Sequence, residues 1–121
     1  MNEPNQGRHL LLDLHEASGL ADMERIEQAL RDAAAVIGAT LLDIKLHKFT
    51  GAGGITGVAT LAESHISIHT WPERAFAAID IFVCGDLDPA DAVGVLDAAF
   101  RPGQRVIKIL GRGKPGLPEL A

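Results

Sequence analysis

The chain has 121 residues, of which 47% are hydrophobic and 22% charged, and its formal net charge is -5. This length fits one domain that buries roughly two-thirds of its unfolded surface. The acidic balance argues against a broad surface for nucleic acid or anionic membranes. There is no signal-peptide pattern and no membrane-spanning run, and the single cysteine, Cys84, excludes an intrachain disulfide. We therefore expect a cytoplasmic protein.

The first half of the chain predicts a helix between two strands. Residues 1–7 indicate a disordered leader, and residues 8–15 a short apolar strand. A helix is expected from its capping residue Asp22 to Ile37, because apolar residues recur on one helical face before a glycine ends it. Apolar and polar residues then alternate over 40–49, which predicts the next strand.

Glycines and prolines divide the second half into further elements. The glycine-rich segment 51–54 lacks the Gly-Lys-Ser/Thr ending of a phosphate loop and is interpreted as a turn. Strands are expected at 55–61, 65–70 and 75–84, and proline breaks the chain between the last two, at Trp71-Pro72-Glu73.

The end of the chain predicts one more helix and strand. Asp88-Pro89 is a typical helix start, and Val93, Leu96 and Phe100 follow on one face of the expected helix. A final strand is expected over 104–110. A flexible tail with solvated basic side chains at Arg112 and Lys114 should follow from Gly111.

These elements predict an α+β two-layer sandwich. Short connections among the central strands favour antiparallel pairing. Two helices covering one face of a mainly antiparallel sheet complete the architecture, in one domain spanning residues 1–121.

The segment 65–69, His-Ile-Ser-Ile-His, carries most of the polar signal. Histidines four apart suggest zinc on a helix. On the strand that this alternation predicts, however, the rings of His65 and His69 start roughly 13 Å apart, too far to share a metal, and we expect no metal site. On spacing alone, His65, Ser67 and His69 are a polar strand face at the surface, and Cys84 is a small buried hydrophobe.

Longer motifs make the chain resemble the prokaryotic S-adenosylmethionine decarboxylase proenzymes, over about residues 7–110. The most specific motif is 61–73, which reads Leu-Ala-Glu-Ser-His-Ile-Ser-Ile-His-Thr-Trp-Pro-Glu, followed by 77–85, Ala-Ala-Ile-Asp-Ile-Phe-Val-Cys-Gly. Further matches are Gly7-Arg8-His9-Leu10, Gly38-Ala39-Thr40 and His47-Lys48-Phe49.

The resemblance implies self-cleavage between Glu63 and Ser64. The Ser64 hydroxyl would attack the Glu63 carbonyl to give an ester, whose elimination and loss of ammonia leave a pyruvoyl group at residue 64. By match, His69 is the proton acceptor of this processing. The products would be a β chain, 1–63, and an α chain, 64–121, and the family assembles as a dimer of such cleaved protomers.

The same match gives roles in catalysis. The pyruvoyl cofactor derived from Ser64 would form a Schiff base with the substrate amine and accept electrons as carbon dioxide leaves. Cys84 would then be the proton donor, a role that suits a thiol because it holds a proton at neutral pH yet can release it.

The expected substrate pocket departs from the family pattern. The common Tyr-Gly-Tyr after Trp-Pro-Glu is Arg74-Ala75-Phe76 here, and the common Val-Ser-Gly-Val-Val is 55–59, Ile-Thr-Gly-Val-Ala. An adenosyl sulfonium ligand calls for aromatic faces and a carboxylate. The substrate-binding candidates are Phe49, Glu73, His65 and Trp71, although packing is an equally good role for the tryptophan.

The resulting interpretation is a decarboxylase that converts S-adenosylmethionine to S-adenosyl 3-(methylsulfanyl)propylamine for spermidine biosynthesis. Decarboxylation of ornithine or arginine with the same cofactor is an alternative, because those substrates share the α-amino acid end. A non-cleaving binding protein or partner subunit is a second alternative. The presence of Ser64, His69 and Cys84 together argues against it.

Overall fold

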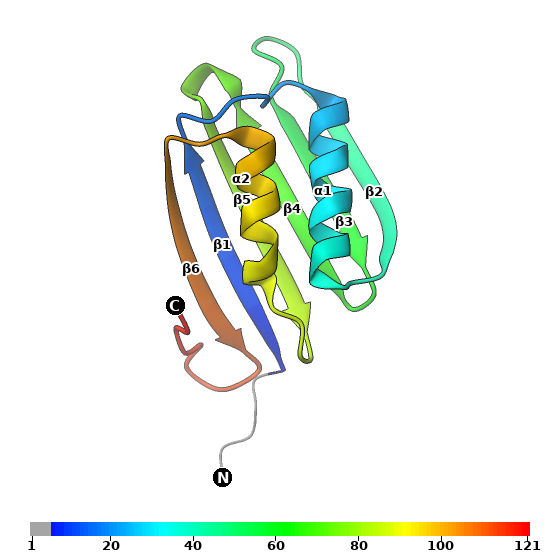
Figure 1. Cartoon of the computed structure of the whole chain (residues 1–121), viewed down its shortest axis with the longest axis vertical. Coiled ribbons are helices and arrows are strands. Elements are labelled where there is room, and N and C mark those ends of the chain that lie inside the picture. The colour runs from blue at the N-terminus through cyan, green and yellow to red at the C-terminus, as the bar shows by residue number, and fades with distance from the viewer. Residues whose placement is uncertain (1–5) are drawn as a thin grey trace.

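A single antiparallel sheet of six strands, in the order β2-β3-β4-β5-β1-β6, carries both helices on one of its faces (Figure 1). The structure is a computed structural model that describes residues 6–121. Its elements are β1 (Gly7–His15), α1 (Met23–Ile37), β2 (Leu41–Lys48), β3 (Ile55–Leu61), β4 (Ser64–Trp71), the 3-10 helix η1 (Pro72–Arg74), β5 (Phe76–Cys84), the 3-10 helix η2 (Pro89–Ala92), α2 (Val93–Phe100) and β6 (Gln104–Arg112). The predicted α+β two-layer sandwich is confirmed. None of the described helices has the length and apolar character needed to cross a membrane.

Helix α1 begins and ends as its sequence predicts. The Asp22 carboxylate accepts a hydrogen bond from the backbone N–H of Arg25 at 3.1 Å, which satisfies one of the free donors of the first turn. Gly38 ends the helix at a φ of 86°, a left-handed conformation that glycine adopts without strain.

Strand alternation separates the core from the polar face of the sheet. In β4, Ile66 and Ile68 are buried beneath the helices, as are Leu10, Leu12 and Leu14 of β1. His65, Ser67 and His69 therefore point to the opposite face, which none of the described helices covers (Figure 1). This uncovered face, called the open face below, carries the candidate chemistry.

Proline changes the local geometry of two predicted segments. The second helix starts as the 3-10 turn η2, capped by the Asp88 carboxylate 3.0 Å from the N–H of Ala90, and only becomes an α-helix at Val93. At Pro72 the predicted break is the turn η1, which ends at Ala75 with a φ of 51°.

The expectation of a flexible tail is wrong. β6 continues to Arg112, Glu119 forms a bridge to Leu110, and Leu120 donates its N–H to the carbonyl of Ile109 at 2.6 Å. The tail thus folds back on the edge of the sheet. The predicted leader is also shorter than expected, because Gly7 already pairs with Cys84 in the sheet; residues 1–5 of that prediction lie outside the described residues.

Candidate active site

The bond expected to break lies in the tight turn between β3 and β4. Ala62 donates its N–H to the carbonyl of Thr40 at 2.9 Å, which ties the turn to the start of β2. Glu63 adopts a φ of 61°, a left-handed conformation that costs a residue with a Cβ about 1 kcal/mol. Backbone strain is therefore located on the N-terminal side of the Glu63–Ser64 bond.

Ser64 and Cys84 lie together because β4 begins where β5 ends. The Ser64 Oγ is 3.9 Å from the Cys84 Sγ, and the Sγ is 3.8 Å from Oε2 of Glu63. Cys84 is partly exposed, so the interpretation of this residue as a buried hydrophobe, drawn from spacing alone, is wrong. The thiol is placed to exchange a proton with groups at residue 64.

His69 lies at the other end of β4. It is five residues beyond Ser64, about 16 Å along an extended strand, so the two side chains of one chain do not meet. The His69 Nδ1 instead contacts the Thr56 Oγ1 at 3.1 Å. Thr56 was missed as a site residue, although the hairpin register that pairs it with His69 is a signal that could have found it.

Three of the four substrate-binding candidates lie at this same end. The ring centroids of Trp71 and His69 are 6.4 Å apart, and Trp71 stacks on Phe76 at 5.3 Å. Phe49 is exposed with its ring against His47, and Glu73 is exposed in η1. His65, the fourth candidate, lies at the Ser64 end. The predicted residues thus form two groups at opposite ends of the sheet.

Between these groups, three donors converge on the carboxylate of Asp80. His9 Nε2 and His65 Nε2 donate to Oδ2 at 2.6 and 2.9 Å, and the Ser67 hydroxyl donates to Oδ1. Partial burial raises the pKa of Asp80, but the hydrogen bonds from Ser67, His65 and His9 outweigh it, so the pKa lies below its ordinary value. Asp80 is therefore ionised at neutral pH.

Arg112 determines which ring nitrogen of His9 carries the proton in this hydrogen-bonded cluster. Its Nη1 is 2.8 Å from His9 Nδ1, and its guanidinium lies over the Phe82 ring. A guanidinium only donates, so His9 accepts at Nδ1 and carries its proton on Nε2, facing Asp80. The expectation that Arg112 is solvated is therefore wrong.

His9, His65 and Asp80 otherwise have the spacing of a metal site, since their ligand atoms lie within 4.8 Å of one another. A metal ligand must present an unprotonated nitrogen. Arg112 fixes the proton of His9 on the nitrogen that would have to bind. The cluster is accordingly a hydrogen-bond network around one carboxylate.

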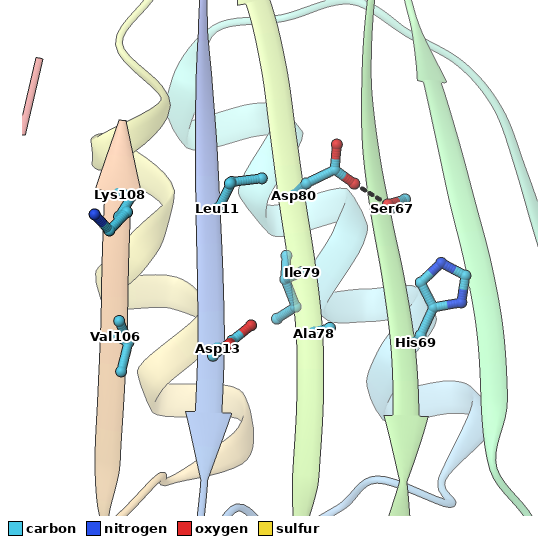
Figure 2. Close-up of a pocket in the computed structure, with 9 residues that line it drawn as sticks. All are labelled: Leu11, Asp13, Ser67, His69, Ala78, Ile79, Asp80, Val106 and Lys108. Atoms are coloured by element: carbon cyan, nitrogen blue, oxygen red, sulfur yellow. Dashed lines mark hydrogen bonds between the residues drawn. The ribbon is translucent and has the colours of Figure 1, made fainter. Parts of the chain in front are cut away.

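A shallow hollow of about 420 Å³ lies beside this network on the open face (Figure 2). Figure 2 shows Ser67 and Asp80 joined on its upper rim and His69 to one side, with Val106 and Lys108 of β6 opposite. Neither Ser64 nor Cys84 lines it. Polar or charged side chains line the hollow from β1, β4, β5 and β6, among them Asp13 and Lys108, and Leu11 and Val106 add apolar surface.

Comparison with known proteins gives one family throughout. The family model described as S-adenosylmethionine decarboxylase matches residues 8–113. An S-adenosylmethionine decarboxylase proenzyme of Thermomicrobium roseum is 40% identical over 88% of this chain and 93% of its own. The S-adenosylmethionine decarboxylase proenzyme of Methanococcus maripaludis is 43% identical over 88% of this chain and 89% of its own.

The solved structures agree. The adenosylmethionine decarboxylase of Aquifex aeolicus superposes with a TM-score of 0.82 at 31% identity, covering 98% of this chain and 100% of that one. The Trypanosoma brucei enzyme, with a TM-score of 0.63 at 12% identity over 85% of this chain and 45% of its own, shows a likeness of fold alone.

Proposed function

This chain belongs to the S-adenosylmethionine decarboxylase family, and we propose that it decarboxylates S-adenosylmethionine after cleaving itself between Glu63 and Ser64. The observation that carries the proposal is the meeting of Ser64, Cys84 and the left-handed Glu63 at one turn. The same residue, Ser64, then supplies the reactive group of the mature enzyme.

Self-cleavage begins with an exchange of bonds at the Glu63 carbonyl. The Ser64 oxygen forms a bond to that carbon as the Ser64 nitrogen leaves it, which converts an amide to an ester. A hydroxyl is a weak nucleophile and needs a base or an oriented hydrogen bond. The turn places the Ser64 hydroxyl next to the bond it attacks, and the strain at Glu63 raises the free energy of the uncleaved chain.

The residues around position 64 fit the pyruvoyl group that this cleavage would leave. That group supplies an electrophilic ketone that binds the substrate amine and accepts electrons when carbon dioxide departs. The Cys84 thiol, 3.9 Å from the Ser64 Oγ, is within reach to deliver a proton there. The Glu63 carboxylate beside the sulfur offers a partner for that proton.

His69 can serve this site only from a second copy of the chain. Its separation of about 16 Å from Ser64 in one chain is too large for proton transfer. In a two-fold dimer, residue i of one copy contacts residue j of the other while j contacts i, so a two-fold axis that runs across the strands brings opposite ends of the same surface together. We propose that two open faces pack together, so that His69, Phe49, Trp71 and Glu73 of one copy lie against Ser64 and Cys84 of the other.

The open face has the character of such an interface. Leu11, Val58 and Val106 on it are 40%, 39% and 46% exposed. Leu11 and Val106 also line the hollow, and a second sheet would cover these apolar residues and the hollow together. This arrangement excludes water from the hollow.

S-adenosylmethionine is the substrate that the relatives support, rather than ornithine or arginine. Its decarboxylated product would supply aminopropyl groups for spermidine. The cytoplasmic location expected from the sequence stays a prediction.

The direct test is carbon dioxide release from S-adenosylmethionine, ornithine and arginine assayed side by side. We expect release from S-adenosylmethionine, with uncleaved Ser64→Ala as the inactive control. Cys84→Ala should cleave itself yet lose turnover by at least about a hundredfold, the usual effect of removing a general acid. Preferential release from ornithine or arginine would contradict the substrate, and full turnover by Cys84→Ala would contradict the donor.

A further inference from the structure

Self-cleavage removes the covalent tether of residue 64. In the precursor, the turn at Ala62 and Glu63 holds the start of β4 against the end of β3. After cleavage, residue 64 is a free chain end, and chain ends fray unless something holds them. Residue 64 nevertheless has to stay beside Cys84 during every turnover, because the thiol delivers its proton there.

Two kinds of contact hold the start of β4. His65 is paired in the sheet between Thr60 and Phe82, so its backbone is fixed on both sides. Its side chain, 40% exposed, donates to Asp80 at 2.9 Å, whereas the Asp80 side chain is only 22% exposed. The hydrogen bond to Asp80 is thus a side-chain anchor one residue away from the new chain end.

The anchor itself is fixed from the other side. Arg112 holds His9 as a donor toward Asp80, and Ser67 occupies the second carboxylate oxygen. The Phe82 ring lies 5.6 Å from His9 and 6.0 Å from His65. A carboxylate that accepts from three directions has little freedom to move.

We propose that Asp80 is a positioning residue that, through His65, keeps the chain end at residue 64 beside Cys84 after cleavage. The inference rests on the proposed self-cleavage. In the precursor, the turn between β3 and β4 holds residue 64 beside Cys84. In the processed enzyme, this positioning role passes to Asp80.

Asp80→Asn tests this role with the smallest change in side-chain shape. It keeps the shape of the side chain but replaces one acceptor with a donor, which faces a donor of His9, His65 or Ser67. Asp43→Asn is the matched control, because Asp43 lies on the same face in the row of Thr60 and His65 but is exposed on β2.

The measurement is amide hydrogen exchange of residues 65–67 in two backgrounds. In processed protein, Asp80→Asn should exchange about tenfold faster than the unsubstituted chain, the size expected for one lost charge-assisted hydrogen bond. In the uncleaved Ser64→Ala background, where the turn still holds these residues, the same substitution should accelerate the exchange of these amides clearly less. Asp43→Asn should have no effect in either background.

The outcomes separate this inference from the function it rests on. An unsubstituted chain that never cleaves would refute the proposed function. Unchanged exchange in processed Asp80→Asn, or equal acceleration in both backgrounds, would overturn only the positioning role. A folded Asp80→Asn chain that stays uncleaved would also overturn it, because the assigned role begins after cleavage. If Asp80→Asn does not fold, His65→Ala removes the same hydrogen bond at a partly exposed side chain, and its exchange is judged by the same criteria.

Discussion

The carboxylate of Asp80 accepts hydrogen bonds from three side chains of the open face, those of His9, His65 and Ser67. None of these donors has to be charged to form its hydrogen bond. Arg112 donates to Nδ1 of His9, so His9 donates to Asp80 from Nε2, and Ser67 donates through an uncharged hydroxyl. The negative charge of Asp80 is therefore stabilised by hydrogen bonds more than by opposite charge.

This arrangement predicts a dependence of stability on acid pH. The pKa of Asp80 lies below its ordinary value of 3.8 in the folded chain, so the unfolded chain binds this proton more readily. The stabilisation that ionised Asp80 gives to the folded chain is complete above pH 3.8. It is lost as the pH falls through the lower pKa that Asp80 has in the folded chain. The Asp80→Asn chain lacks this titrating group.

Urea unfolding at fixed protein concentration in the Ser64→Ala background tests this sign. The difference in free energy of unfolding between the chain that retains Asp80 and the chain with Asp80→Asn should shrink as the pH falls from about 5 to about 3. A difference that stays constant over this range would show that Asp80 is not the titrating group.

Single residues were predicted unevenly by the sequence. Ser64, His69 and Cys84 stand in a long specific motif, but their positions along β4 and β5 separate His69 from the other two. Asp80, Thr56 and Arg112 were not predicted as site residues. Asp80 looked like an ordinary polar position of an alternating strand, and Arg112 lies 103 residues from His9, a separation that no local pattern bridges.

At the scale of elements, the β3–β4 turn is the part that the proposed chemistry uses. Glycine at position 63 would adopt the left-handed conformation without strain. Glu63→Gly should therefore cleave about fivefold more slowly, because about 1 kcal/mol no longer raises the free energy of the uncleaved chain. Glu63→Gln keeps the Cβ and the strain but removes the carboxylate.

The half-life of the precursor, followed by gel or mass spectrometry, distinguishes these causes. Strain predicts slow cleavage in Glu63→Gly and ordinary cleavage in Glu63→Gln. Equal slowing in both variants would assign the effect to the carboxylate instead, and ordinary cleavage in Glu63→Gly would show that strain at residue 63 does not speed cleavage.

Elements with a strong period were predicted well. Alternation placed β2, β3, β4 and β5 within a residue or two, and the cap at Asp22 with the glycine at 38 bounded α1. The tail was wrong because its glycines and prolines are typical of flexible segments, whereas its order comes from backbone hydrogen bonds to β6. Such contacts between distant backbone groups leave no pattern in the side chains.

At the scale of the whole molecule, the separation of Ser64 from His69 predicts complementation between copies. Ser64→Ala and His69→Ala should each stay uncleaved alone. In a mixed dimer, the His69→Ala copy contributes an intact Ser64 and its partner an intact His69, so one complete site exists.

Co-expression of the two variants with different tags tests this arrangement. We expect cleavage of the His69→Ala chain only. No cleavage of either chain in a dimer shown to be mixed would place His69 and Ser64 in the same copy, contrary to the distance along β4.

The central claim is that Ser64 becomes the reactive group of the mature enzyme, and denaturing mass spectrometry of the purified protein tests it most directly. We expect two chains, 1–63 and 64–121, with the second lighter than its serine form by one ammonia. A single intact chain under varied conditions, or a second chain that still begins with serine, would contradict it.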